Sequence, residues 1–277
     1  MISVHYYYAL GYLSPFYADH PVAFYKSLVA APMDVERLLQ ETLKQIDAAA
    51  PAGKKIQIAL DEWNEGSMGK RPMDEPEAFS LTRFVTAMNR LGMDYNLPLE
   101  DALYAARMLH VLMRLGNRIP LACRTHMVNN LGAIRASSTT AYVTAAGTAM
   151  QLYAMHSGTE LMKLEQQSPT YNVPENGWKD IPYLDATATL SKDGSRLFVH
   201  LLNLEVSKTM DVHLRIAGRS VEPQADLWQI SAQSFMARNY FGAPTVSVQH
   251  HQIDDAGSDF VQALPAHSAT TVELRLR

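Results

Sequence analysis

The stretch of sequence that decides the fold is Lys55-Ile-Gln-Ile-Ala-Leu60, which continues without a turn into Asp61-Glu-Trp-Asn64. Its apolar and β-branched residues predict a short buried strand. Two carboxylates and an indole follow directly at the carboxyl end of that strand. In barrels of parallel strands, residues at the carboxyl ends of the strands face the active site. The stretch therefore predicts a parallel α/β arrangement with a polar site at the end of this strand.

The sequence on either side alternates between strand and helix patterns. Upstream, Ile2–Tyr8 predicts a strand, and Asp34 is a candidate N-cap for a helix that ends before Pro51. Downstream, the patterns predict a helix over Leu99–Leu115 that stops at Gly116, a strand over Ile119–Ala122 and a helix around Ala146–His156. This alternation predicts βαβ units and a parallel sheet.

The pattern changes near Gly158 to short strands separated by turn signals. Leu184–Leu190 and Arg196–Leu202 flank Ser191-Lys-Asp-Gly-Ser195, in which Asp-Gly is a hairpin signal. Further strands are predicted over Thr209–Ile216, Thr245–Val248 and Thr270–Leu276. We therefore expect an α/β part over residues 1–157 and an all-β part, an antiparallel β-sandwich, over residues 158–277.

The number of strand–helix units limits the architecture of the first part. About three such units precede the sandwich, whereas a (β/α)₈ barrel needs eight units and typically ~250 residues. Three parallel strands cannot close a barrel. The first part is therefore either a different α/β architecture or the terminal β/α units of an incomplete TIM barrel.

The composition narrows the classes of function. The chain has 277 residues, an apolar fraction of 47% and a net charge of −4. These values indicate a globular protein without the dense basic face that a nucleic-acid partner requires. The single cysteine, Cys123, excludes an intrachain disulfide and favours a reducing compartment. Because the chain also starts without a signal-peptide pattern and has no membrane-spanning apolar run, we expect a cytoplasmic protein that contacts no membrane.

Two strand ends carry side chains suited to work on a sugar. The carboxylate of Glu62 could attack an anomeric carbon, and the ring of Trp63 could pack against the C–H face of a sugar. Alternatively, Asp61 or Glu62 caps the next segment or pairs with a lysine. His5 and Tyr7 end the first strand, where they could hydrogen-bond a carboxylate or simply pack in the core.

A further candidate residue follows the third predicted strand, and the sequence lacks metal-binding motifs. His126, just after the third predicted strand, could line a pocket or serve the loop structure. His250 and His251 are adjacent in a predicted strand and would point to opposite faces, so they are poorly placed to bind one ion. The sequence has no C-x-x-C pair, no H-x-x-x-H pair and no glycine-rich phosphate loop. We therefore expect neither a metal nor a cofactor.

The motifs taken together resemble a known family. They are Ile2-Ser-Val-His-Tyr-Tyr7, Ile58-Ala-Leu-Asp-Glu-Trp-Asn64, Glu100-Asp-Ala-Leu-Tyr-Ala-Ala-Arg-Met-Leu-His110, Val128-Asn129 and Pro182-Tyr-Leu-Asp-Ala186. In this order and spacing they resemble the C-terminal part of α-L-arabinofuranosidases of glycoside hydrolase family 51, over nearly the whole chain. The resemblance implies the end of a catalytic barrel followed by a C-terminal β-sandwich.

The resemblance also implies a reaction and a set of roles. The family hydrolyses terminal non-reducing α-L-arabinofuranosyl residues with retention, so the expected substrate is an arabinofuranoside-containing oligosaccharide or polysaccharide. Glu62 stands at the position of the catalytic nucleophile, and Tyr7 at that of a tyrosine which contacts it. His5, Trp63 and His126 are expected to bind substrate.

The same resemblance implies that half of the machinery lies elsewhere. The family's acid/base glutamate belongs to a Gly-Asn-Glu motif on the fourth barrel strand, and no such tripeptide occurs here. We therefore expect an incomplete enzyme that is inactive alone, either a fragment, the product of a miscalled start, or a split enzyme with a partner chain. The competing hypothesis is a non-catalytic remnant that binds carbohydrate or another protein. The sequence leaves open whether the chain forms a homo-oligomer.

Overall fold

A computed structural model describes residues 1–8, 20–65, 98–129 and 131–277 of the chain. Its first half holds the elements β1 (Ile2–Tyr8), α2 (Pro21–Ala49), β2 (Ile58–Glu65), α4 (Leu99–Leu115), β3 (Leu121–Arg124), β4 (Ile134–Ala136), β5 (Ala141–Val143) and α5 (Ala145–Met155). Its second half holds β6 (Glu160–Leu161), β7 (Thr170–Val173), the 3₁₀ turn η2 (Pro174–Asn176), β8 (Trp178–Pro182), β9 (Leu184–Leu190), β10 (Arg196–Asn203), β11 (Met210–Arg215), β12 (Val221–Ile230), β13 (Gln249–Ile253), β14 (Asp259–Leu264) and β15 (Ser268–Leu276). Helices are thus confined to the first half, apart from a single 3₁₀ turn, in the part of the chain that the structure describes.

Three parallel strands form the sheet of the first half, in the order β1-β2-β3. Along the described residues α2 comes after β1, α4 after β2, and α5 after β3 and the short strands β4 and β5, so the predicted strand–helix alternation is confirmed. One face of the sheet packs against the helices through Tyr8, Ile58 and Leu60. On β1 the alternate positions, Ser3 and His5, are exposed on the other face.

The helix α2 begins earlier than the sequence predicts. Asp34 is not its N-cap but lies inside the helix, where its carboxylate pairs with Arg37 at 2.8 Å. The apolar stripe continues upstream through buried Leu28 and Ala31. The helix starts at Pro21, where a missing N–H costs nothing because the first turn has no acceptor for it. Asp34 therefore does not mark the start of the helix, although its residue type is common at helix N-caps.

The antiparallel half contains a large sheet and a small sheet, besides a two-stranded ladder of β7 and β8 that packs against α2. The large one has six strands in the order β13-β12-β15-β10-β9-β6, and the small one pairs β11 with β14. A common core joins them, since Val212 and Leu264 of the small sheet pack in one cluster with Leu201 and Val272 of the large sheet. The predicted β9–β10 hairpin is confirmed. The strand predicted over Thr245–Val248 is wrong, because the pairing with β12 begins only at Gln249.

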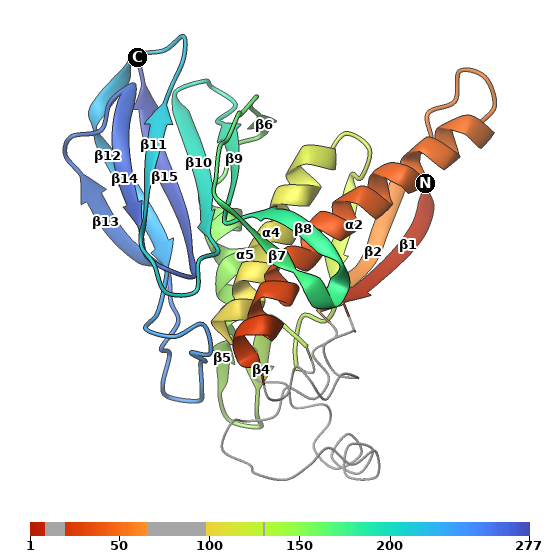
Figure 1. The fold of residues 1–277 in the computed structure, drawn as a ribbon, viewed down its shortest axis with the longest axis horizontal. Helices are drawn as coiled ribbons and strands as arrows, with labels where there is room; N and C mark the ends of the chain where they lie inside the picture. Colours follow the sequence, from red (N-terminus) through yellow and green to blue (C-terminus); the bar gives the residue numbers. More distant parts are fainter. Residues whose placement is uncertain (9–19, 66–97, 130) are drawn as a thin grey trace.

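The helices lie between the parallel sheet and the six-stranded sheet (Figure 1). A single core runs through this layer, from Ile58 of β2 and Leu103 of α4 to Leu202, Ile230 and Ala269 of the large sheet. The helix α4, which has the predicted bounds, is buried along most of its length. It therefore links the two sheets.

Candidate active site

The open face at the carboxyl ends of β1 and β2 carries the candidate nucleophile. The two strands pair in register from Ile2 to Val4, and then the register shifts so that His5 pairs with Glu62. One extra residue, Asp61, is accommodated at this bulge. Because a bulge reverses the facing of the residues that follow it, Glu62 comes to the same side as His5.

Tyr7 and His5 contact Glu62 directly. The hydroxyl of Tyr7 donates a hydrogen bond of 2.8 Å to Oε2 of Glu62. The Nδ1 atom of His5 lies 3.6 Å from the same oxygen, and the side chains of His5 and Glu62 are 51% and 43% exposed. Burial raises the pKa of Tyr7, and the bond to Glu62 acts in the same direction. Tyr7 therefore remains protonated and donates to the carboxylate at neutral pH.

A second carboxylate lies on the other side of His5. Asp61 accepts hydrogen bonds of 2.9 Å from the hydroxyl of Ser3 to both of its oxygens. Its Oδ1 lies 3.3 Å from Nε2 of His5. The hydrogen bond from Ser3 holds the pKa of Asp61 below its usual value, although partial desolvation opposes this. The imidazole of His5 thus lies between two carboxylates.

Trp63 is a correction to the sequence analysis. Its side chain is 1% exposed and packs in the core, so it offers no ring face to a sugar. The bulge at Asp61 explains this, because it turns Trp63 to the helix side, beside Tyr6. A strand with regular alternation would have placed Trp63 on the open face and Glu62 in the core.

His126 is exposed in the segment after β3. Its side chain makes no hydrogen bond or ion pair with any residue that the structure describes, and none joins it to Glu62. The backbone of this segment, however, is bound to β2, since the N–H of Thr125 donates to the carbonyl of Trp63 at 3.2 Å. The segment therefore lies at the same strand ends as Glu62.

The sequence patterns do not predict the residues that hold these strand ends in place. The amide of Asn64 donates to the carbonyl oxygens of Thr125 and Leu131, the latter at 3.1 Å. Arg124 forms a buried ion pair with Glu65 at 3.1 Å. The side chain of Ser3 could have been found from its period-two spacing to His5, whereas the contacts of Asn64 depend on residues about sixty positions away.

Comparison with known proteins identifies the family. Residues 61–268 match the family model of the α-L-arabinofuranosidase C-terminal domain. The chain belongs to this family.

Curated relatives are similar over most of the chain. The probable α-L-arabinofuranosidase C of Aspergillus niger is 25% identical over 261 residues, which are 90% of this chain and 46% of the relative. The intracellular exo-α-(1→5)-L-arabinofuranosidase of Streptomyces lividans is 24% identical, over 81% of this chain and 33% of the relative. The chain thus spans half or less of the length of these relatives.

Solved structures of arabinofuranosidases share the fold. The α-L-arabinofuranosidase of Thermotoga maritima, solved with arabinose, has a TM-score of 0.79 at 25% identity, over 100% of this chain and 53% of its own. A family 51 α-L-arabinofuranosidase of Bifidobacterium longum has a TM-score of 0.81 at 19% identity, over 99% of this chain and 53% of its own. The chain therefore corresponds to the C-terminal part of family 51 α-L-arabinofuranosidases, as its motifs predict.

The described part of the chain shows no group of three or more His, Cys, Asp or Glu side chains that could hold a metal ion. His250 stacks on Trp228 with ring centroids 4.1 Å apart, and its Nε2 lies 2.8 Å from Asp226.

Among the described helices, none has the length and hydropathy needed to cross a bilayer.

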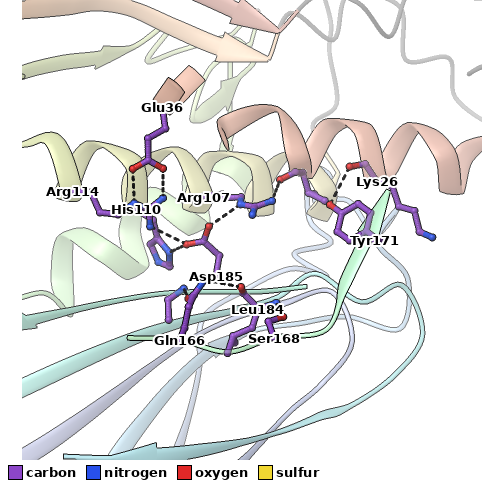
Figure 2. Close-up of polar contacts among 12 residues, drawn as sticks. Lys26, Glu36, Arg107, His110, Arg114, Gln166, Ser168, Tyr171, Leu184 and Asp185 are labelled. Carbon is purple, nitrogen blue, oxygen red and sulfur yellow. Dashed lines mark hydrogen bonds and ion pairs between the residues drawn. The ribbon is translucent and has the colours of Figure 1, made fainter. Parts of the chain in front are cut away.

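A buried ionic network joins the helices of the chain to its large sheet (Figure 2). Asp185 of β9 accepts a hydrogen bond of 2.8 Å from Arg107 and one of 2.7 Å from Nδ1 of His110. The guanidinium of Arg114 lies 3.2 Å from Asp185 and forms two bonds of 2.8 Å to Glu36 of α2. Burial alone would raise the pKa of Asp185, but the charge of Arg107 and the bond from His110 hold it well below its usual range. Ion pairs and a hydrogen bond to Asp185 therefore bind α4 to β9.

Two buried histidines behind this network stay neutral. Nε2 of His110 lies 2.7 Å from the hydroxyl of Tyr153, and the ring of His200 stacks on Tyr153 at 5.0 Å. Burial lowers the pKa of His110 and lowers that of His200 further. Since Asp185 can only accept from Nδ1 of His110, Tyr153 donates to Nε2.

These histidines predict a loss of stability in weak acid. In the unfolded chain a histidine titrates near pH 6.5, so below that pH the unfolded state binds protons that the folded state excludes. The stability contributed by neutral His110 and His200 is complete above this pH and falls as the pH drops below it. We expect the free energy of unfolding in urea to fall by about 1–2 kcal/mol between pH 7 and pH 5.5. In His200→Gln the slope should be shallower, because one of the buried sites that exclude a proton is gone.

The matched control for this measurement is His213→Gln, because His213 is exposed on β11. It should keep the wild-type slope. An unchanged slope in His200→Gln would contradict the assignment of buried neutral histidines.

Proposed function

We propose that the chain carries the nucleophile half of a retaining α-L-arabinofuranosidase site. Residues 1–157 are then the terminal β/α units of an incomplete TIM barrel, and residues 158–277 are its C-terminal β-sandwich domain. The observation that carries the proposal is the hydrogen-bonded pair of Tyr7 and Glu62 on the open face of the parallel sheet, in a chain of this family. In a barrel this face lines the active site at the carboxyl ends of the strands.

Glu62 is the nucleophile in this proposal. Its Oε2 accepts from Tyr7, whereas Oε1 accepts no hydrogen bond from the described residues and is left to attack the anomeric carbon. The bond from Tyr7 fixes the rotation of the carboxylate, and fixed geometry is a large part of nucleophilic catalysis. His5 and the segment of His126 border the same strand ends, and we assign both residues to substrate binding.

We propose that the second carboxylate comes from residues outside these 277. A retaining mechanism needs an acid/base group about 5 Å from the nucleophile. Asp61 is not that group, because it is held by Ser3 and its pKa is lowered, whereas a general acid must hold a proton. We therefore assign the proton to a glutamate on a segment or partner chain that completes the barrel.

The substrate class follows from the relatives. Their names specify α-L-arabinofuranosidases, and the Streptomyces relative is named for α-(1→5) linkages and an intracellular location. We propose a terminal non-reducing arabinofuranosyl residue of an oligosaccharide or polysaccharide as the substrate. A cytoplasmic location accords with the single cysteine.

The proposal is tested by the release of a leaving group. An activated aryl α-L-arabinofuranoside needs little protonation on departure, so the 277-residue chain should release about one equivalent slowly and then stall, since no base activates water. On a natural arabino-oligosaccharide the first step should be about 10²–10⁴-fold slower, the factor typical of lost acid catalysis. Full turnover of the natural substrate by this chain alone would show that another residue supplies the proton.

The contact between Tyr7 and Glu62 makes its own prediction. In Tyr7→Phe the carboxylate loses its fixed rotation and a charge-assisted hydrogen bond, worth roughly 1.5–3 kcal/mol. The rate of the aryl burst should fall by about tenfold or more, while its amplitude stays the same. A lower amplitude with an unchanged rate would instead indicate misfolded protein.

A further inference from the structure

An exposed aromatic cluster lies at the same end of the molecule as the candidate active site. It consists of Tyr142 of β5 and of Tyr240 and Phe241 in the loop between β12 and β13. Figure 1 shows β4, β5 and this loop at the end to which the carboxyl ends of β1 and β2 point. Tyr240 is 51% exposed and Phe241 46%, while Tyr142 is half-buried.

The loop that carries two of these side chains is held rigidly. Buried Asn239 donates to the carbonyl of Val143 at 2.9 Å and to that of Val246 at 2.7 Å, and it accepts from the N–H of Val246 at 2.6 Å. Tyr240 and Ala243 exchange backbone hydrogen bonds of 3.1 Å across a tight turn. Gly242 takes the left-handed conformation that this turn requires, with φ +76°. The turn therefore holds two large aromatic side chains outward in a fixed position.

The cluster is continuous with the strand that carries Glu62. Asn64 binds the carbonyl of Leu131, and the hairpin β4–β5 follows within a few residues. The rings of Tyr142 and Phe241 then meet edge to face, with centroids 4.8 Å apart and an interplanar angle of 89°. Hydrogen bonds and ring contacts thus link the end of β2 to the exposed face of Phe241.

The exposed area of the cluster favours a sugar over a second protein as its ligand. An aromatic side chain carries about 200 Å² of surface, so the three exposed fractions add up to roughly 250 Å². A stable interface between two proteins needs ~800 Å² on each side. One or two sugar rings match the smaller area, since a sugar offers an apolar C–H face to a ring and hydroxyls to the tyrosine oxygens.

We propose that Tyr142, Tyr240 and Phe241 form a sugar-binding subsite for the part of the substrate beyond the arabinosyl residue that is cleaved. The ring face of Phe241 packs on a sugar ring, and the tyrosine hydroxyls hydrogen-bond its hydroxyl groups. This inference rests on the proposed function, because it takes the substrate to be an oligosaccharide that enters at the ends of β1 and β2. It makes the sandwich domain part of the binding site.

Binding measurements with two probes test the subsite. L-arabinose occupies only the site at Glu62, whereas α-(1→5)-linked arabinotriose also reaches the aromatic cluster. In Phe241→Ala of the 277-residue chain, we expect the Kd for arabinotriose to rise about tenfold, as follows from roughly 60 Å² of lost apolar contact, and the Kd for arabinose to stay unchanged. Phe241→Leu should lose part of this affinity, because it keeps the apolar bulk but not the flat ring face.

The control variant is Val261→Ala, which removes an equally exposed side chain from β14 of the sandwich and should change neither affinity. The subsite is overturned if Phe241→Ala leaves the Kd for arabinotriose unchanged, if Phe241→Leu binds like the wild type, or if Phe241→Ala only changes the oligomeric state. Absence of arabinose binding in the wild type would be a failure of the proposed function itself, and the subsite would fail with it.

Discussion

The Glu62→Gln variant is expected to release no burst of leaving group from an activated aryl α-L-arabinofuranoside. The amide is nearly isosteric with the carboxylate and can still accept from Tyr7, but it is not a nucleophile toward an anomeric carbon. The loss should therefore be complete, although the fold and the exposed surface are unchanged. Stopped-flow or slow-time absorbance of the released aryl alcohol measures it.

Asp61→Asn is the matched control for this variant. It neutralises the neighbouring carboxylate, which lies at the same strand end and also contacts His5. We expect its burst rate to remain within about twofold of the wild type, as for a substitution outside the reacting groups. Equal loss in both variants would indicate that the charge of the strand end, and not the nucleophile at Glu62, controls the reaction.

The Asp185→Ala variant is expected to lose about 3–5 kcal/mol of stability, as is usual when one partner of a buried ion pair is removed. The side chain of Asp185 is 5% exposed, and those of Arg107 and His110 are fully buried, so the substitution leaves the buried guanidinium of Arg107 without its carboxylate. The midpoint of thermal unfolding should fall by about 10 °C. Urea unfolding of the wild type and the variant measures the difference.

Asp259→Ala is the control for this second prediction. Its ion pair with Arg215 spans 3.2 Å, but the two side chains are 65% and 78% exposed, so solvent screens it. No measurable change in stability is expected. A loss in Asp185→Ala as small as that in Asp259→Ala would mean that the network between α4 and β9 does not hold the two layers together.

The sequence predicts those elements whose determinants are local. The bounds of α4 follow from its apolar spacing and from Gly116, and the β9–β10 hairpin follows from its Asp-Gly turn. The start of α2 was misplaced because a good capping residue, Asp34, lies inside a longer apolar stripe. The two hairpin strands β4 and β5 were missed because three-residue strands carry almost no periodic signal.

The sequence predicts the candidate site only in part, because some of its contacts join residues that are far apart along the chain. Its strand ends and its acidic side chains could be read from Asp61-Glu-Trp-Asn64, but the bulge depends on pairing with a strand 55 residues away. That bulge decides that Glu62 is on the open face and that Trp63 is in the core. The network around Asp185 likewise joins residues about 75 positions apart, and a hydrophobic-periodicity argument does not predict such contacts.

The mass of the protein after exposure to the activated aryl arabinofuranoside tests most directly whether Glu62 is the nucleophile. Stalling after the first step should leave one arabinofuranosyl group covalently bound, and proteolytic mapping should place it on the peptide that contains Glu62. Glu62→Gln should carry no adduct under the same conditions, while Asp61→Asn should be labelled like the wild type. An adduct on another residue, or equal labelling of Glu62→Gln, would contradict the assignment of Glu62 as the nucleophile.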